Sequence, residues 1–144
     1  MKEIKNKRLD VYLSRIESYL LDEFNIEVVY SHQVSDAYYD SARVIEINNR
    51  QNKLSRLHSL LHESGHASLR NEKRRIKFTK NFPFMRKEGS SKRGDKNHRV
   101  DVIREEVLAW ERGYEIAIQL GIDIDDELWA RHRKNALVTY MEWF

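Results

Sequence analysis

The 144-residue chain contains no cysteine, one proline and five glycines. The absence of cysteine excludes disulfide bonds and zinc sites built on thiolates, so any metal ion must be held by histidine and carboxylate side chains. No apolar run approaches the roughly 20 residues that a membrane-spanning helix needs. Residues 1–5 also lack the apolar core of a signal peptide, so we expect a cytoplasmic protein with no membrane partner.

Positive charge is concentrated in one part of the chain. Residues 70–99 carry twelve Lys and Arg against three Asp and Glu, a net charge of +9, whereas the whole chain carries +3. This segment also contains the single proline and lacks hydrophobic periodicity. We therefore expect one domain over residues 1–144, with a basic flexible loop at about residues 70–99. Such a loop can contact nucleic acid, but lysine-rich loops are more often simply solvated.

Hydrophobic spacing outside the basic segment predicts an α+β fold. Apolar residues three or four positions apart predict four helices, at about residues 3–24, 53–69, 100–121 and 125–140. Runs rich in valine, isoleucine and tyrosine predict two strands, at about residues 26–31 and 43–48. The polar stretch between the strands should join them as a hairpin or a longer loop.

The most informative motif of the chain is His62-Glu63-Ser64-Gly65-His66. Residues four apart lie on one face of a helix, so His62 and His66 can bind one Zn²⁺ ion at about 2.0–2.1 Å per bond. Glu63 lies between them, where its carboxylate can act on a water molecule. The alternative is a surface helix with two unrelated histidines. The residues that precede the motif have an amphipathic pattern, which argues against this alternative. Glycine is costly inside a helix, so we expect another backbone or the metal site to approach Gly65 closely.

A catalytic zinc site usually has a third protein ligand, and the candidates downstream are His98 and several glutamates. On a helical projection at about 100° per residue, Glu106 is the only charged residue in the middle of the apolar face. Glu105 falls on the border of that face, whereas Glu111 and Glu115 face solvent. A buried carboxylate needs a partner, either an arginine in a salt bridge or the metal ion. We interpret Glu106 as the third ligand.

These motifs and their order resemble the ImmA/IrrE family of minimal zinc metallopeptidases. The resemblance covers about residues 26–118, and small phage-type peptidases with a Glu-x-x-Ala-Trp element look similar as well. It implies a single zincin-like domain with an N-terminal helix, a small β-hairpin or sheet, the HExxH helix, the helix of the third ligand and a C-terminal helix. The sequence differs from the family in having Trp110 where Asn or Asp is usual.

The resemblance also implies an activity. The chain would be a zinc metallopeptidase that hydrolyses a peptide bond in a cytosolic protein, with a regulatory protein as the expected kind of substrate. His62, His66 and Glu106 would hold Zn²⁺, and Glu63 would be the catalytic general base. The oxyanion formed in the reaction needs a further donor, for which Tyr114, His98 and an arginine of residues 86–99 are candidates.

Two other functions fit the same residues. In the first, the chain is a SprT-like protease of DNA-associated proteins, with His98 as the third ligand and the basic segment on DNA. In the second, it is a zincin-like binding or inhibitor protein without catalytic activity. The presence of Glu63 argues against the second function, because a structural zinc site needs no general base.

Overall fold

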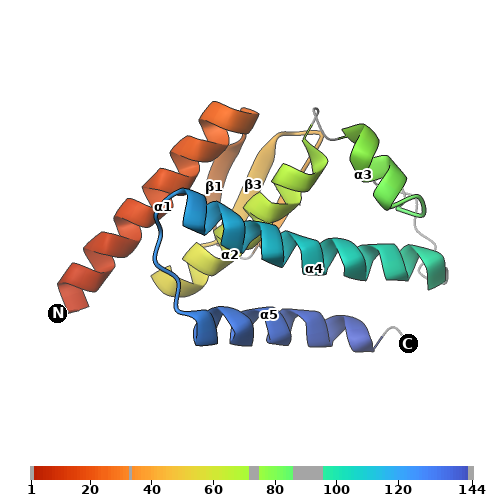
Figure 1. Ribbon diagram of the computed structural model, residues 1–144. Coiled ribbons are helices and arrows are strands. Elements are labelled where there is room, and N and C mark those ends of the chain that lie inside the picture. The colour runs from red at the N-terminus through yellow and green to blue at the C-terminus, as the bar shows by residue number, and fades with distance from the viewer. Residues whose placement is uncertain (1, 33, 72–74, 86–95, 143–144) are drawn as a thin grey trace.

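The computed structural model describes residues 2–32, 34–71, 75–85 and 96–142. Within these ranges the chain forms five helices and a three-stranded mixed sheet, which confirms the predicted α+β class (Figure 1). None of these helices is both long enough and apolar enough to cross a membrane. The elements, in chain order, are α1 (Lys2–Phe24), β1 (Glu27–Ser31), β2 (Ala37–Tyr39), β3 (Val44–Asn48), α2 (Lys53–Arg70), α3 (Arg75–Asn81), α4 (Lys96–Gln119) and α5 (Asp126–Met141).

The sheet has the strand order β1-β3-β2. β1 and β3 are parallel, with Glu27 opposite Val44, and β2 runs antiparallel to β3, with Ala37 opposite Glu46. The polar stretch that was expected only to join two strands therefore contains a strand of its own. Arg43, with a positive φ of 55°, lies in the turn that returns the chain from β2 to β3. This topology makes β2 an edge strand, close to α2.

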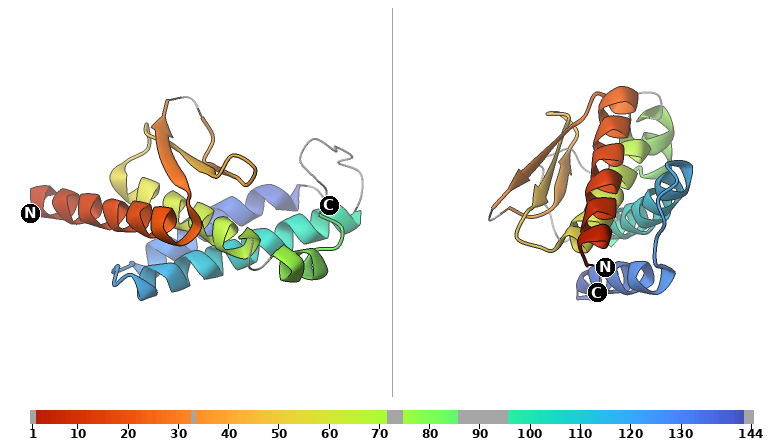
Figure 2. Two further views of the ribbon diagram at one scale, coloured as in Figure 1. Left: turned by 90° about the horizontal axis from the view of Figure 1, so that it is seen from above. Right: turned by 90° about the vertical axis from the view of Figure 1, so that its left-hand side faces the viewer.

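α2 is the central helix of the molecule. The sheet lies on one side of it and α4 on the other, while α1 packs beside it (Figure 2). Its first turn is capped by Asn52, whose side chain accepts a hydrogen bond of 2.9 Å from the backbone N–H of Ser55. The apolar stripe predicted from spacing is buried and forms the core together with β3 and α1. Because α2 is held on several sides, side chains at its surface have defined positions.

α2 and α4 approach each other at two glycines. A Cβ atom added to Gly65 would lie 2.0 Å from the carbonyl oxygen of Ala109, and one added to Gly113 would lie 2.5 Å from that of Leu61. Both distances are too short for any side chain, so only glycine allows the backbones to come this close. This contact is the close approach that the sequence predicted for Gly65. It also places Glu106, one turn before Ala109, against α2.

The structure differs from the predicted loop at residues 70–99. Residues 75–81 form α3, and α4 begins at Lys96 rather than near residue 100. Phe78 and Phe82, four positions apart, pack with ring centroids 4.7 Å apart, and Phe82 is buried. The backbone N–H of Phe84 then donates to Asp101 of α4 over 2.7 Å, which attaches this segment to the core. Two parts of the predicted flexible loop, residues 72–74 and 86–95, lie outside the described residues.

α5 runs beside α4 and completes the helical side of the molecule (Figure 1). Asp125 caps it by accepting hydrogen bonds from the backbone N–H groups of Glu127 and Leu128 at 3.0 and 3.1 Å. Trp129 in its first turns is buried and anchors α5 to the core. The later turns of α5 lie over a cavity, described below.

Candidate metal centre

Three predicted ligands come together between α2 and α4. His62 and His66 lie on the face of α2 that meets α4, with ring centroids 4.7 Å apart. Glu106 of α4 places one carboxylate oxygen 2.9 Å from His62 Nε2 and the other 3.1 Å from His66 Nε2. Two imidazoles from one helix and a carboxylate 44 positions after the first of them therefore converge on one point.

Glu63 lies next to these residues but is placed differently. Its carboxylate approaches the Nδ1 atom of His62, at 3.5 Å, whereas Glu106 reaches the Nε2 atoms of both histidines. Each of His62, Glu63 and His66 has a potential ligand atom within 4.8 Å of the others, so distance alone does not distinguish the two glutamates. The contact with both Nε2 atoms favours Glu106 as the ligand and leaves Glu63 beside the metal position.

Glu105 contacts the ring nitrogen of His66 that faces away from Glu106. The sequence did not identify Glu105 as a partner of this histidine. One of its carboxylate oxygens pairs with His66 Nδ1, and the carboxylate also accepts a hydrogen bond of 3.0 Å from Arg70 Nε. Glu105 is 3% exposed, so this contact is well shielded from water. With Nδ1–H directed at Glu105, the Nε2 atom of His66 is left as the metal-facing nitrogen, an arrangement common in metal sites. The border position of Glu105 on the helical projection and the arginine at the end of α2 are the signals that could have suggested it.

Carboxylates outnumber imidazoles at the centre, and their negative charge favours a bound cation. Burial by itself would lower the pKa of His66, but hydrogen bonds to Glu105 and Glu106 raise that pKa well above its usual value. Burial would likewise raise the pKa of Glu106, but hydrogen bonds from His62 and His66 hold it far below the usual range. Three carboxylates thus surround two imidazoles, and Arg70 pairs with one of them. The charge and the donor set fit Zn²⁺.

Glu63 keeps the character of a base. It is 6% exposed, and burial raises its pKa, although the nearby His66 and His62 oppose that effect. A carboxylate with a raised pKa accepts a proton more readily than one in water. Glu63 therefore combines burial with a position beside both histidines.

Trp110 supports the ring of His62. The two rings stack with centroids 4.3 Å apart and an angle of 12° between their planes, and Trp129 of α5 packs on Trp110 edge-on at 4.9 Å. The flat contact fixes the orientation of the His62 ring. The tryptophan that separates this sequence from the family pattern thus has a structural role at the metal centre.

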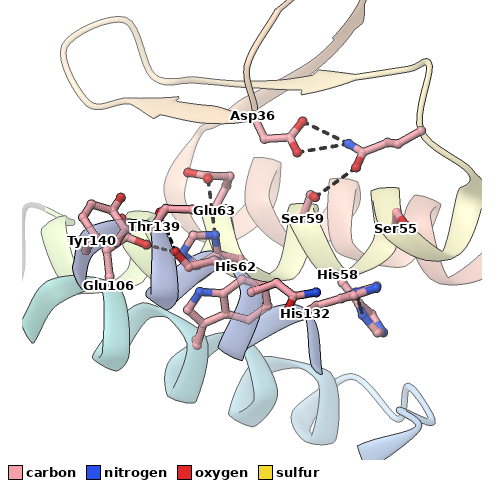
Figure 3. A pocket seen from close by; sticks show the side chains of 14 residues that line it. Asp36, Ser55, His58, Ser59, His62, Glu63, Glu106, His132, Thr139 and Tyr140 are labelled. Atoms are coloured by element: carbon pink, nitrogen blue, oxygen red, sulfur yellow. Dashed lines mark hydrogen bonds and ion pairs between the residues drawn. The ribbon is translucent and has the colours of Figure 1, made fainter. Parts of the chain in front are cut away.

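Two cavities open at the centre. The larger, of about 460 Å³, lies on the side of His62, between α2, α5 and the chain before β2 (Figure 3). The smaller, of about 270 Å³, lies on the side of His66 beside β2 and the start of α4. Asp36, Glu63 and Glu106 line both cavities, so the centre lies where they meet. A chain that occupied both cavities would cross directly over Glu63.

The oxyanion donors suggested by sequence lie elsewhere. The hydroxyl of Tyr114 donates to Asp126 at 2.7 Å, and His98 Nδ1 lies 3.2 Å from the carbonyl oxygen of Phe84. Neither residue lines either cavity, and neither does Arg99. The other arginines considered, at residues 86–95, lie outside the described residues.

His58, one turn before His62, contacts α5. Its Nδ1 atom lies 2.6 Å from Nδ1 of His132, and its ring also packs on Trp129. Burial, followed by the nearby His132, lowers the pKa of His58 to about 4. His58 therefore packs between α2 and α5 and faces away from the candidate metal centre.

Comparison with models of protein families, with curated proteins and with solved structures found no match to this chain. The function is therefore inferred from the geometry of the centre and from its motifs.

Proposed function

We propose that this protein is a zinc-dependent metallopeptidase with a zincin-like domain of the ImmA/IrrE type. The observation that carries this proposal is the convergence of His62, His66 and Glu106 beside Glu63, at the meeting point of two open cavities. The proposed substrate is a cytoplasmic protein, with a regulatory protein as the first candidate from the family resemblance.

His62, His66 and Glu106 would hold the zinc ion, which when bound supplies the Lewis acidity that polarises a scissile carbonyl and activates water near neutral pH. Glu63 takes the proton from the attacking water and passes it to the nitrogen of the leaving amine. Trp110 and Glu105 hold the two imidazoles in the orientation that this arrangement needs. The two cavities provide room for substrate residues on either side of the bond.

The SprT-like alternative needs His98 as a ligand. Its contact with the carbonyl of Phe84, and its absence from both cavities, favour Glu106 instead. Nucleic-acid binding by the basic residues 70–99 remains a separate prediction, testable by the salt dependence of binding.

The non-catalytic alternative is tested by Glu63. A structural zinc site is usually closed by four protein ligands, whereas the three proposed ligands lie where two open cavities meet. If Glu63→Gln retains the biological effect of the parent protein, the function is binding and not catalysis.

Metal content is the first test. We expect about one zinc per chain by elemental analysis in the parent protein, and its loss in His62→Ala and Glu106→Ala. Glu111→Ala, at an exposed position on the same helix, is the matched control and should keep its zinc. A parent protein that takes up no zinc when it is supplied would contradict the proposal.

Cleavage is the second test, with a mixture of fluorescence-quenched peptides as the probe. Glu63→Gln should keep its zinc but lose activity by about 10²–10⁴-fold, the usual contribution of a general base. Zinc-loaded parent protein that cleaves neither this mixture nor unfolded proteins would remove the support for a peptidase.

A further inference from the structure

α5 adds a phenol to the proposed catalytic centre. His132, Ala136 and Tyr140 are spaced four residues apart, so they form one face of α5, and all three line the larger cavity. Tyr140 lies at the end of the cavity that also contains Glu63 and Glu106 (Figure 3). Its phenol shares this lining with the carboxylate of Glu106 and interacts with it.

α5 is held in place by contacts at its other end. His132 meets His58 of α2, and Trp129 packs against Trp110 of α4. These contacts tie α5 to both ligand-bearing helices, so the position of Tyr140 over the centre is set by packing on the same elements. A side chain supported in this way can serve as a fixed hydrogen-bond donor.

Three other hydroxyl groups line the cavity: Ser55 lies at the opposite end from Tyr140 (Figure 3), and Thr139 and Ser59 have partners of their own. Thr139 donates to the backbone carbonyl of Ala136 at 2.7 Å, and Ser59 lies 3.4 Å from the side-chain oxygen of Gln51. No lysine or arginine is among the described residues that line this cavity. Tyr140 is thus the hydroxyl beside Glu63 and Glu106 that can donate toward a substrate.

We propose that Tyr140 is a catalytic residue that donates a hydrogen bond to the oxyanion formed on the scissile carbonyl. This inference rests on the proposed peptidase function. Tyr140 and Glu106 line the same cavity, and the phenol interacts with the Glu106 carboxylate. A small rotation of the side chain would direct its O–H toward a carbonyl oxygen that enters from the cavity. The phenol keeps its proton throughout, and no bond to it is formed or broken.

The test is Tyr140→Phe, which removes only the hydroxyl, with Tyr114→Phe as the matched control. Tyr114 also donates to a carboxylate, that of Asp126, but it lines neither cavity. For each protein we would measure zinc affinity, then kcat and KM on the fastest-cleaved peptide of the quenched mixture. A phosphinic peptide of the same sequence, which imitates the tetrahedral intermediate, provides a binding measurement that does not depend on turnover.

For Tyr140→Phe we expect kcat to fall about 10²–10³-fold, the usual cost of one oxyanion donor, with KM little changed. Affinity for the phosphinic peptide should fall as well, while zinc affinity stays within about threefold, below the loss usual for a ligand-supporting residue. Tyr114→Phe should match the parent in every measurement.

Other outcomes overturn the inference. Unchanged kcat and phosphinic-peptide affinity in Tyr140→Phe would exclude the hydroxyl from the reaction. A fall in zinc affinity of about 10–100-fold would make Tyr140 a positioning residue for Glu106 instead. If the parent protein itself binds no zinc, the proposed function fails, and that result is distinct from a failure of Tyr140 in an active parent.

Discussion

His66 has a carboxylate at each ring nitrogen, Glu105 at Nδ1 and Glu106 at Nε2. Glu105 does not face the metal position, but it sets which nitrogen does. Its own charge is balanced by Arg70, whose guanidinium contacts the same carboxylate. The metal affinity of the site therefore depends on a residue that binds no metal.

Glu105→Gln should lower zinc affinity about 10–100-fold, because the amide keeps the shape of the side chain but loses the charge that orients and polarises His66. Competition with a chromophoric chelator measures the change. Glu111→Gln, on the exposed face of α4, is the control and should bind zinc like the parent. Equal affinity in Glu105→Gln would mean that helix packing alone orients His66.

His58 should make the metal-free protein sensitive to acid. Its pKa is lowered to about 4 by burial and by His132, with Asp125 opposing, whereas an unfolded histidine titrates near 6.5. Between these values the unfolded chain binds the proton more readily, so stability is present above pH ~6.5 and is lost as the pH falls toward ~4. The loss should be roughly 2–3 kcal/mol.

Urea unfolding in the presence of a chelator, at several pH values from about 7 to about 4.5, measures this effect. The difference in unfolding free energy between the parent and His58→Leu should shrink as the pH falls, because the leucine side chain cannot take up a proton. Effects of titrating groups that do not contact His58 cancel in this difference. A difference that does not change with pH would show that His58 has the same pKa in the folded and unfolded protein.

Individual residues differed in how well sequence could place them. The position of Glu106 follows from helical periodicity, which shows one charged residue on an apolar face. Glu105 was assigned to the border of that face because a projection of one helix cannot show that Arg70 of another helix is near. Tyr140 falls within a helix predicted from sequence, but its place in the same cavity as Glu106 depends on how α5 packs, which periodicity does not specify.

At the scale of elements, the contact between α2 and α4 is the feature that fixes the centre. Gly65→Ala should stabilise an isolated helix by about 1 kcal/mol, since alanine is the better helix former. In the folded protein the new methyl group meets the carbonyl of Ala109, so we expect destabilisation of about 1–3 kcal/mol.

The sign of the change in unfolding free energy thus reports whether the helices are in contact. Urea unfolding of the parent and Gly65→Ala measures it. Zinc affinity should fall together with stability, because α4 must move and carries Glu106 with it. A more stable Gly65→Ala protein would contradict the close packing of α2 on α4.

Long amphipathic elements were predicted well and short ones poorly. α1, α2 and α5 repeat their apolar residues over several turns. Their helical type and approximate bounds can therefore be predicted from the sequence. β2 spans three residues within a polar stretch, and α3 spans seven residues within a lysine- and arginine-rich one. Both are held by contacts with a neighbouring element, β3 for β2 and α2 for α3, and those contacts leave no periodic signal of their own.

For the whole molecule, zinc should act as a link between two helices. A ligand that binds only the folded state stabilises it by about 4 kcal/mol at a free concentration of about 1,000 times Kd. For a chain of this size that corresponds to a rise in Tm of roughly 10 °C. Thermal unfolding with zinc and with chelator measures the difference. Glu106→Ala should show little of it, and an equal rise in that variant would place the ion elsewhere.

The order in which the centre is assembled follows from the contact between Glu106 and the HExxH helix. His62 and Glu106 are 44 positions apart, and α5 follows later still. A polypeptide leaves the ribosome from its N-terminus, so α2 emerges with both imidazoles before the third ligand has been made. If the centre is the proposed peptidase site, capture of the metal would await α4, and α5 would add its phenol afterwards. Translation itself would then delay hydrolytic competence until after the chain can bind its ion.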